Sequence, residues 1–312
     1  MATPRQHRTA ARVPPAATPP RRERVAELVR RHPLACYLFL CFTLTWLAWT
    51  PYVLSDNGMG LLSFGFPEVL GSPQTLGMLP GAYLGPLFSA YLVITIAEGE
   101  PGLRTWARRL FRWRIGWCWF LLILLGVPAA QVLGTFFLPQ AWETVQLPSI
   151  SALLVYLPFL AVQVAFTGVA EEPGWRDFAL PRLQHRHGPL AGTLILGLLW
   201  GAWHLPLFLT EWAGWPHVDP VQIIEFLVTS VVIGIPMTWV FNRTGESLPA
   251  VMLLHAGINN ATSVLWLPMF PELDVHRDAQ HALLITSAVI SIALIAATRG
   301  RLGYQPPTNR HV

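Results

Sequence analysis

The sequence predicts an all-α fold, a polytopic membrane helix bundle of about eight transmembrane helices. Of the 312 residues, 53% are hydrophobic and only 12% are charged. A soluble domain has roughly twice that charged fraction. The apolar residues gather in eight separate stretches, each near the roughly 20 residues that a helix needs to cross a bilayer, and arginines concentrate in every second loop between them.

Residues 1–33 are predicted to be a disordered basic tail, because they are rich in arginine, proline and alanine without apolar periodicity. A secretory signal is the alternative. It is rejected because the charged region is too long, the apolar stretch after it is of membrane length, and no small-residue cleavage site follows. We therefore expect a transmembrane domain at 34–298 and a C-terminal tail at 299–312.

Each apolar stretch is predicted to form one membrane-spanning helix, and internal proline and glycine are tolerated in such helices. The expected spans are residues 34–52, 76–97, 117–138, 150–170, 189–209, 223–240, 248–267 and 282–298.

The arginines predict the orientation of the bundle. Of all arginines in the sequence, only Arg277 falls in the loops of the opposite side. Positively charged loops stay in the cytoplasm, so we expect a multi-pass protein of the cell membrane with both termini cytoplasmic. Residues 104–114 interleave arginines with aromatics, which is typical of an interfacial helix against anionic membrane lipids. A nucleic-acid arm is the alternative for this segment, and no nucleic-acid partner is predicted.

The remaining composition excludes two kinds of site. Cys36, Cys41 and Cys118 all fall in or at the edge of apolar stretches, so neither a disulfide framework nor a thiolate zinc site is expected. Every basic residue besides histidine is arginine, a bias that indicates a GC-rich bacterial genome.

Two adjacent carboxylates and an arginine follow the fourth apolar stretch, where residues 171–176 read EEPGWR. Charged side chains at the end of a membrane-length stretch cost free energy. They are expected there when they pair with each other and have a function. On a helix, Glu172 and Arg176 are four residues apart and can form an ion pair. Glu171 points about 100° away from that pair. We therefore predict that Glu172 and Arg176 are structural and that Glu171 is available for chemistry.

The depth of these carboxylates depends on where the fourth helix ends. Hydropathy alone ends it at Ala170, at the cytoplasmic rim, whereas His204 would lie ~22 Å along the next helix from Pro189. Pro173 lacks a backbone donor and clashes with the carbonyl of Val169, so a kink is expected there. We favour a bent helix whose continuation, residues 175–182, re-enters the protein.

Polar side chains on two further helices complete the candidate site. Glu172 lies 16 positions before Gly188 and His204 lies 16 positions after it, so an antiparallel hairpin that turns at Gly188 places them at matching height. On the seventh helix, His255 and Asn259 are four residues apart and share one face. The prediction is that Glu171, His204, His255 and Asn259 face one cavity.

These residue types suit the addition of water to an amide. A carboxylate in a dry pocket, here Glu171, can take a proton from a water molecule that the imidazole of His204 holds. The side chains of His255 and Asn259 can donate hydrogen bonds to the oxyanion that develops. The alternative is a zinc ion on Glu171, His204 and His255 with an open position for water. Since asparagine is an uncommon zinc ligand, the metal-free assignment is preferred.

Structural interpretations of the same residues also remain open. The ion pair of Glu172 with Arg176 can simply lock two helices together. Either histidine can be satisfied by a backbone carbonyl, and Trp200 can be a packing residue or part of the pocket wall. The joint pattern favours a functional site over separate structural roles.

At these residues the sequence resembles the CPBP family of intramembrane proteases, which comprises CAAX prenyl endopeptidases and bacteriocin-processing proteases and is also called the ABI family. The family pattern is E-E-x-x-x-R, an aromatic four residues before a histidine, and H-x-x-x-N. Here these motifs are Glu171-Glu172 with Arg176, Trp200 with His204, and His255 with Asn259.

The resemblance spans residues 150–267 and implies an intramembrane endopeptidase that acts on membrane-associated proteins or peptides. It implies that Glu171 is the general base, His204 holds the water, His255 and Asn259 stabilise the oxyanion, and Glu172, Arg176 and Trp200 support the site. The alternative is a non-proteolytic scaffold, a bacteriocin-immunity protein, or a carrier with Glu171 as a proton relay. One residue departs from the pattern, because Asp177 stands where the family usually has glycine and can compete for Arg176.

Overall fold

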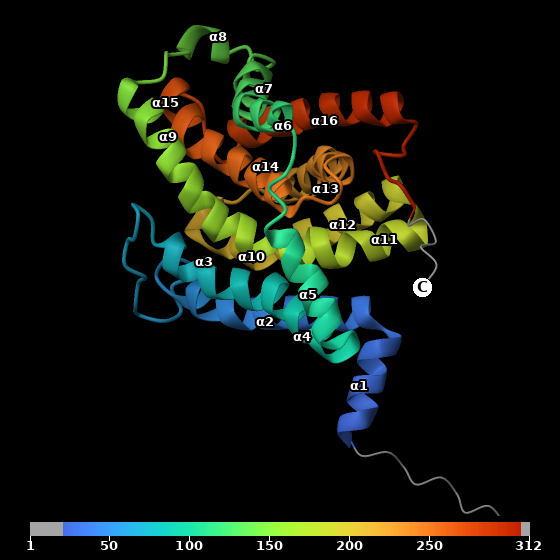
Figure 1. The fold of residues 1–312 in the computed structure, drawn as a ribbon. Helices are drawn as coiled ribbons and strands as arrows, with labels where there is room; N and C mark the ends of the chain where they lie inside the picture. The colour runs from blue at the N-terminus through green and yellow to red at the C-terminus, as the bar shows by residue number, and fades with distance from the viewer. Residues whose placement is uncertain (1–20, 307–312) are drawn as a thin grey trace, which may run out of the picture.

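The computed structural model describes residues 21–306, and over this range the chain is a bundle of long helices (Figure 1). Apart from one isolated β-bridge between Val69 and Ser72, these residues form only helices and loops. Within residues 21–306, eight helices are long and apolar enough to cross a membrane. The predicted all-α, polytopic architecture is confirmed.

The eight spans occur in the predicted order. The first four are α2 (Pro33–Leu54), α3 with α4 (Gln74–Ala82 and Phe88–Ala97), α6 with α7 (Trp117–Leu121 and Val127–Thr135), and α9 through α10 to α11 (Ile150–Gln163, Val169–Glu172 and Leu180–His187). The last four are α12 (Pro189–Trp203), α13 (Pro220–Arg243), α14 with α15 (Leu248–Asn260 and Leu267–Met269), and α16 (Asp278–Thr298). Outside the spans lie α1 (Arg21–Arg31), α5 (Gly99–Leu110) and α8 (Ala141–Thr144).

Several spans contain a π-helical turn, and prolines account for three of them. A proline at position i cannot donate to the carbonyl of residue i−4, which is then free to accept a longer-range bond. In three π-helical segments, one carbonyl lies four residues before a proline. These prolines are Pro128, Pro181 and Pro268. These segments are Leu122–Gly126, Pro173–Ala179 and Ala261–Trp266. The helices therefore change pitch at prolines without breaking.

The fourth span continues well beyond the end that hydropathy indicates. It is helical from Ile150 to His187, and every residue of 170–180 is buried. Figure 1 shows α9 and α11 running in different directions on either side of α10. The bent helix and its buried continuation are thus confirmed, and the bend at Pro173 takes the form of a π-helical segment instead of a break.

The hairpin between the fourth and fifth spans turns at Gly188, as the sequence predicts. Gly188 has φ of 81°, a conformation open to glycine without strain. It caps α11 and begins α12, and the two helices then pack against each other in opposite directions. This turn places the EEPGWR segment beside α12.

The predicted disorder of residues 1–33 is wrong for part of that segment. Residues 1–20 lie outside the described residues, but α1 covers Arg21–Arg31. Glu27 and Arg31 form an ion pair of 2.6 Å one turn apart, and Val29 is buried where α1 packs against α4. The apolar residues Val25, Leu28 and Val29 have helical spacing, and the helix gains a partner that composition does not reveal.

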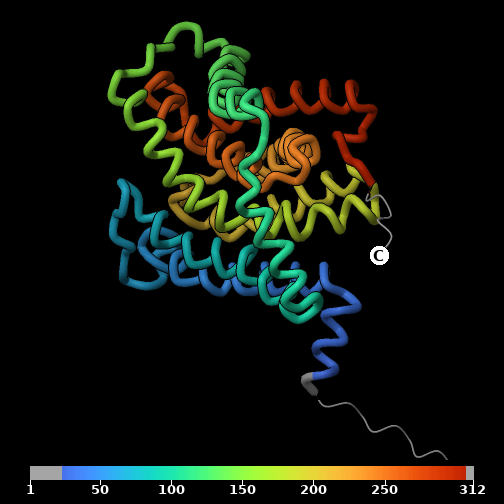
Figure 2. Tube along the Cα trace, in the orientation of Figure 1, coloured from blue at the N-terminus to red at the C-terminus, as the bar shows by residue number. Residues whose placement is uncertain are grey.

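The first two spans support the fourth. α2 packs against α3 and α4, and Figure 2 shows this pair lying along the fourth span. A Cβ atom on Gly174 would lie 2.5 Å from the carbonyl oxygen of Pro86 and 2.6 Å from the hydroxyl of Tyr37. Glycine at this position therefore allows the EEPGWR segment to contact the second span directly.

Candidate active site

The four predicted site residues line one cavity of about 1070 Å³ in the membrane-spanning part of the bundle. Glu171 comes from α10, His204 caps the C-terminus of α12, and His255 and Asn259 come from α14. Three distant spans thus bring their polar side chains to one place, as the helix spacing predicts. The separate catalytic roles of these residues stay predictions.

Glu171 is held by the indole of Trp200. Its side chain lies in the protein interior with only 5% of the residue exposed, and Trp200 Nε1 donates a hydrogen bond of 2.8 Å to Oε2. Oε1 receives no hydrogen bond from any described residue. One carboxylate oxygen is therefore fixed and the other is available to a ligand in the cavity.

His204 is fixed by a backbone carbonyl one turn earlier. Its Nδ1 lies 2.9 Å from the carbonyl oxygen of Trp200, which can only accept, so Nδ1 carries the proton. The rings of Trp203 and Trp212 lie 4.6 and 5.8 Å from the imidazole. In the neutral ring, Nε2 keeps its lone pair and can accept a hydrogen bond from water.

Glu172 connects Arg176 to His255. The predicted ion pair is present, with 3.3 Å between Arg176 Nε and Glu172 Oε2. Sequence spacing missed the second partner, since His255 Nδ1 lies 2.7 Å from Glu172 Oε1. The structural role predicted for Glu172 therefore includes orienting an imidazole of the site, as carboxylates do for histidines in many active sites.

Trp200 lies at the centre of this arrangement. Its ring centroid is 5.7 Å from that of His204 and 5.2 Å from that of His255. The guanidinium of Arg176 lies 4.5 Å from the same ring centroid, in a cation–π contact. Trp200 is thus part of the pocket wall, and it also donates the hydrogen bond that holds Glu171.

Asn259 contributes a free amide to the cavity wall. It lies one turn after His255 on α14, and its side chain makes no hydrogen bond with another described residue. Its neighbour Asn260 points elsewhere and donates to the carbonyl of Tyr156 at 3.0 Å. Of the two adjacent asparagines, only Asn259 presents its carboxamide to the site.

The arrangement of the histidine and acidic side chains bears on the zinc alternative. Among residues 21–306, no three His, Cys, Asp or Glu side chains are arranged so that they could hold a metal ion, and this covers Glu171, His204 and His255. A carboxylate oxygen of Glu171 is instead hydrogen-bonded by an indole N–H. The other oxygen of Glu171 receives no hydrogen bond from a described residue, and the choice between a metal-free site and a zinc site stays a prediction.

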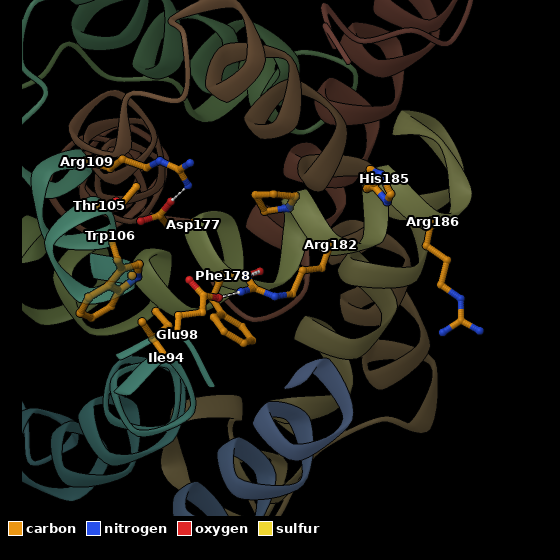
Figure 3. A pocket seen from close by; sticks show the side chains of 12 residues that line it. Ile94, Glu98, Thr105, Trp106, Arg109, Asp177, Phe178, Arg182, His185 and Arg186 are labelled. Atoms are coloured by element: carbon orange, nitrogen blue, oxygen red, sulfur yellow. Dashed lines mark hydrogen bonds and ion pairs between the residues drawn. The ribbon is translucent and has the colours of Figure 1, made fainter. Parts of the chain in front are cut away.

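Asp177 does not compete for Arg176, and that expectation is wrong. The structure places Asp177 Oδ1 2.5 Å from Arg109 Nη1, and Figure 3 shows this ion pair beside a second one between Arg182 and Glu98. On a helix, adjacent residues point about 100° apart, so Asp177 and Arg176 face different neighbours. Asp177 therefore joins the fourth span to α5.

The basic segment 104–114 has a structural role beside the one predicted for it. α5 is helical only to Leu110, and its Trp106 donates a hydrogen bond of 3.1 Å to the carbonyl of Pro173. Together with the ion pair between Arg109 and Asp177, this hydrogen bond holds α5 against the EEPGWR segment. Arg104 and Arg108 remain exposed, as an interfacial helix requires.

Sequence reasoning also missed a second carboxylate in the cavity wall. Glu211 follows the fifth span and accepts hydrogen bonds from Tyr52 at 3.1 Å and from Asn57 at 3.2 Å. The only signal was an acidic residue between Thr210 and Trp212 directly after an apolar stretch. Such a position is ordinary for a loop, and only the packing of distant segments places it at the cavity.

Comparison with known proteins agrees with this geometry. The family described as "Type II CAAX prenyl endopeptidase Rce1-like" matches residues 153–261, a range that contains Glu171, His204, His255 and Asn259. A curated protein of Methanococcus maripaludis named CAAX prenyl protease 2 is 24% identical over 234 residues, which cover 72% of this chain and 81% of that protein. The matched range, the three motifs and their meeting in one cavity indicate the same relationship. Over residues 153–261, which carry the site, the chain is therefore similar to the type II CAAX prenyl endopeptidases, and it is an intramembrane endopeptidase of the CAAX type.

Proposed function

We propose that the protein hydrolyses peptide bonds of membrane-associated proteins or peptides, with a water molecule activated by Glu171 and His204 and without a metal ion. The observation that carries this proposal is the cavity in which a carboxylate with one free oxygen, two oriented imidazoles and a free amide meet. Water, an acceptor for its proton and donors for an oxyanion are what amide hydrolysis requires.

The first step forms the bond between water and the carbonyl carbon. Oε1 of Glu171 takes one proton from the water, while Nε2 of His204 accepts a hydrogen bond from the other O–H. The water oxygen then bonds to the carbonyl carbon, and the carbonyl π electrons move to its oxygen. The hydrogen bond from Trp200 holds Oε2 of Glu171 in place, so Oε1 is the oxygen that takes the proton.

The second step breaks the peptide bond. The oxyanion accepts hydrogen bonds from the amide of Asn259 and from Nε2–H of His255, which is present when that ring is an imidazolium paired with Glu172. Collapse of the intermediate expels the amine, which takes the proton from Glu171. The products are a carboxylic acid and an amine, which become a carboxylate and an ammonium group once the acid's proton passes to the amine, and the site returns to its initial charge.

The direct test is cleavage of lipid-anchored, quenched-fluorescent peptides by the purified protein in detergent. Glu171→Gln and His204→Ala are expected to lower kcat by about a hundredfold or more, as loss of a general base does. His255→Ala and Asn259→Ala remove oxyanion donors and should cost a similar factor. Full activity in Glu171→Gln would sink the proposal and favour a scaffold, an immunity protein or a carrier.

A matched control lies in the same membrane domain. Glu225 and His281 also pair within the bundle, with 2.8 Å between Oε1 and Nε2, and neither lines the cavity. Glu225→Gln and His281→Ala are therefore expected to retain activity within a factor of about two. Activity lost in the controls as strongly as in the site variants would point to loss of fold instead of chemistry.

The prediction that hydrolysis needs no metal ion can be tested separately. Prolonged dialysis against EDTA and 1,10-phenanthroline should leave the peptidase activity unchanged, because none of the assigned groups depends on a metal ion. Metal analysis of the purified protein is the second readout. Activity that disappears on dialysis and returns with Zn²⁺ would overturn the metal-free assignment and restore Glu171, His204 and His255 as ligands.

We further propose that the protein lies in the cell membrane with both termini in the cytoplasm. The arginine distribution supports this orientation. The segment before α2, the connection that contains α5, the end of α11 and the segment after α16 carry most of the arginines, whereas of the opposite loops only the one before α16 carries any, Arg277. The surrounding lipids are then the first partners of the chain, and a membrane-held peptide is its substrate.

A further inference from the structure

The cavity opens toward one end of the bundle. Its loop residues all come from the connections after the first, third, fifth and seventh spans, and they include Leu70, Ser72, Ser149, Glu211, Ala213 and His276. No described residue of the connections 98–116, 183–188 or 243–247 lines it. In Figure 1 the loop after α2 lies at the left edge, whereas α11 and α16 end at the right.

The closed end of the cavity is the arginine-rich end of the protein. The connections that do not reach the cavity carry the clustered arginines of α5 and of α11. By the positive-inside rule this end faces the cytoplasm, so the open end faces the other side of the membrane. A peptide that enters the cavity from water or from the lipid headgroups must therefore come from the outer side.

The charge of the cavity wall selects the peptide further. No arginine lines the described wall, and apart from Glu171 the only carboxylate there is Glu211. Both oxygens of Glu211 have neutral partners, Tyr52 and Asn57, and no described cation lies within ion-pair distance of it. A carboxylate accepts about four hydrogen bonds, so Glu211 keeps free acceptor positions for a ligand in the cavity.

We propose that the substrate is an apolar peptide segment with a nearby basic residue, presented at the outer face of the membrane, and that Glu211 binds the basic group. This inference rests on the proposed peptidase function and on the orientation given with it. The aromatic wall, which includes Phe159, Trp203 and Phe226, contacts the apolar part.

The side of entry can be tested in sealed vesicles prepared from cells. A membrane-impermeant, lipid-anchored quenched peptide with one lysine is added outside right-side-out or inverted vesicles that hold equal amounts of protein. Right-side-out vesicles are expected to cleave it at least about tenfold faster, and detergent should equalise the two. Faster cleavage by inverted vesicles would overturn the inference, whereas no cleavage in detergent would count against the peptidase function itself.

Cysteine labelling reports the open end without any need for activity. In a Cys118→Ser background, an impermeant maleimide is expected to label Ser72→Cys in right-side-out vesicles and His185→Cys in inverted ones. The Cys118→Ser protein without an added cysteine is the blank. Labelling of Ser72→Cys only from the cytoplasmic side would refute entry from the outer face.

The role of Glu211 is tested by substrate preference. The peptide is made with lysine, norleucine or glutamate at one position, and that position is moved along both sides of the cleaved bond. At the best position, wild type should prefer lysine over norleucine by about tenfold in kcat/KM. Glu211→Gln keeps hydrogen-bonding groups for Tyr52 and Asn57 and should bring this ratio close to one. An unchanged ratio would refute the assignment.

Discussion

The hydrogen bond from Trp200 to Glu171 makes an indole part of the site, although sequence spacing alone presents it as pocket wall. Trp200→Phe removes this N–H and keeps a ring beside Arg176, His204 and His255. A hydrogen bond to a charged group contributes about 1.5–3 kcal/mol, so kcat should fall on the order of tenfold to a hundredfold. KM should change less than kcat, because the substitution keeps an aromatic ring in the pocket wall and removes the N–H that contacts the base.

Steady-state kinetics on the lipid-anchored peptide checks this prediction. Trp239→Phe is the matched control, since Trp239 packs against Trp119, 5.1 Å between ring centroids, and does not line the cavity. Equal kcat in Trp200→Phe and Trp239→Phe would show that the indole N–H does not position Glu171.

Glu172 is the only acidic partner of a fully buried arginine among the described residues. Arg176 is 1% exposed, and Glu172→Ala leaves its charge without a counter-ion. Removing one member of a buried ion pair costs about 3–5 kcal/mol. The midpoint of thermal unfolding in detergent should therefore fall clearly, and activity should fall as well because His255 loses its orienting carboxylate. Glu143→Ala, on an exposed loop helix, should change neither, and an equal effect of the two variants would contradict the assignment.

At the scale of the elements, α5 holds the EEPGWR segment from outside the membrane-spanning helices. Arg109→Ala leaves the buried carboxylate of Asp177 unpaired, so it should destabilise the protein far more than Arg108→Ala on the exposed side of the same helix. Adding Asp177→Gly, the residue usual in the family, removes the stranded charge. The double variant should recover about 1–3 kcal/mol relative to the sum of the single effects.

Thermal unfolding of the four proteins of this cycle gives the coupling energy. Additive effects of Arg109→Ala and Asp177→Gly would mean that the ion pair does not link α5 to the fourth span.

The contact between the fourth and second spans depends on one glycine. Gly174→Ala would place a Cβ atom 2.5 Å from the carbonyl oxygen of Pro86, a backbone atom that cannot move freely. We expect loss of stability and of activity despite the higher helix propensity of alanine. Gly234→Ala is the control, because its nearest neighbour would be a methyl group of Thr193 at 3.5 Å. Equal yield, melting midpoint and kcat for the two variants would show that the spans do not need this close approach.

At the scale of the whole molecule, the arginine pattern predicts the topology. A green fluorescent protein fused after the last residue should fluoresce, and alkaline phosphatase fused within residues 56–68 should be active, because the reporters work on opposite sides of the membrane. Exchanging the two reporters is the control and should silence both. The reverse pattern would invert the bundle and move the open end of the cavity to the cytoplasm.

Most of the architecture follows from local properties of the chain. Membrane-length apolar stretches require helices, since the bilayer leaves no other partner for backbone groups, and all eight spans are therefore visible in the sequence. The tail is the exception. α1 is marginal alone and gains stability from α4, a contact between residues far apart in the sequence.

The candidate site could be predicted from the sequence where its residues are spaced by the geometry of a single helix. The spacing of Glu172 with Arg176, of His255 with Asn259, and the hairpin at Gly188 all depend on the regular rise and turn of helices. The ion-pair partner of Asp177 and the hydrogen bond from Trp200 to Glu171 could not be predicted from the sequence. Both depend on how neighbouring helices are rotated and how closely they approach.

The order of apolar and polar residues therefore determines the membrane class, the spans and the set of polar groups that face inward, and the arginine pattern predicts the orientation of the spans. Apolar length, loop charge and the regular turn of a single helix are enough for these features, because each is a local property of the chain. Which oxygen of Glu171 is free, which carboxylate orients His255, and which end of the bundle opens to the cavity depend on side chains from different spans meeting in three dimensions. Packing between spans sets those distances, and no spacing along the chain encodes them.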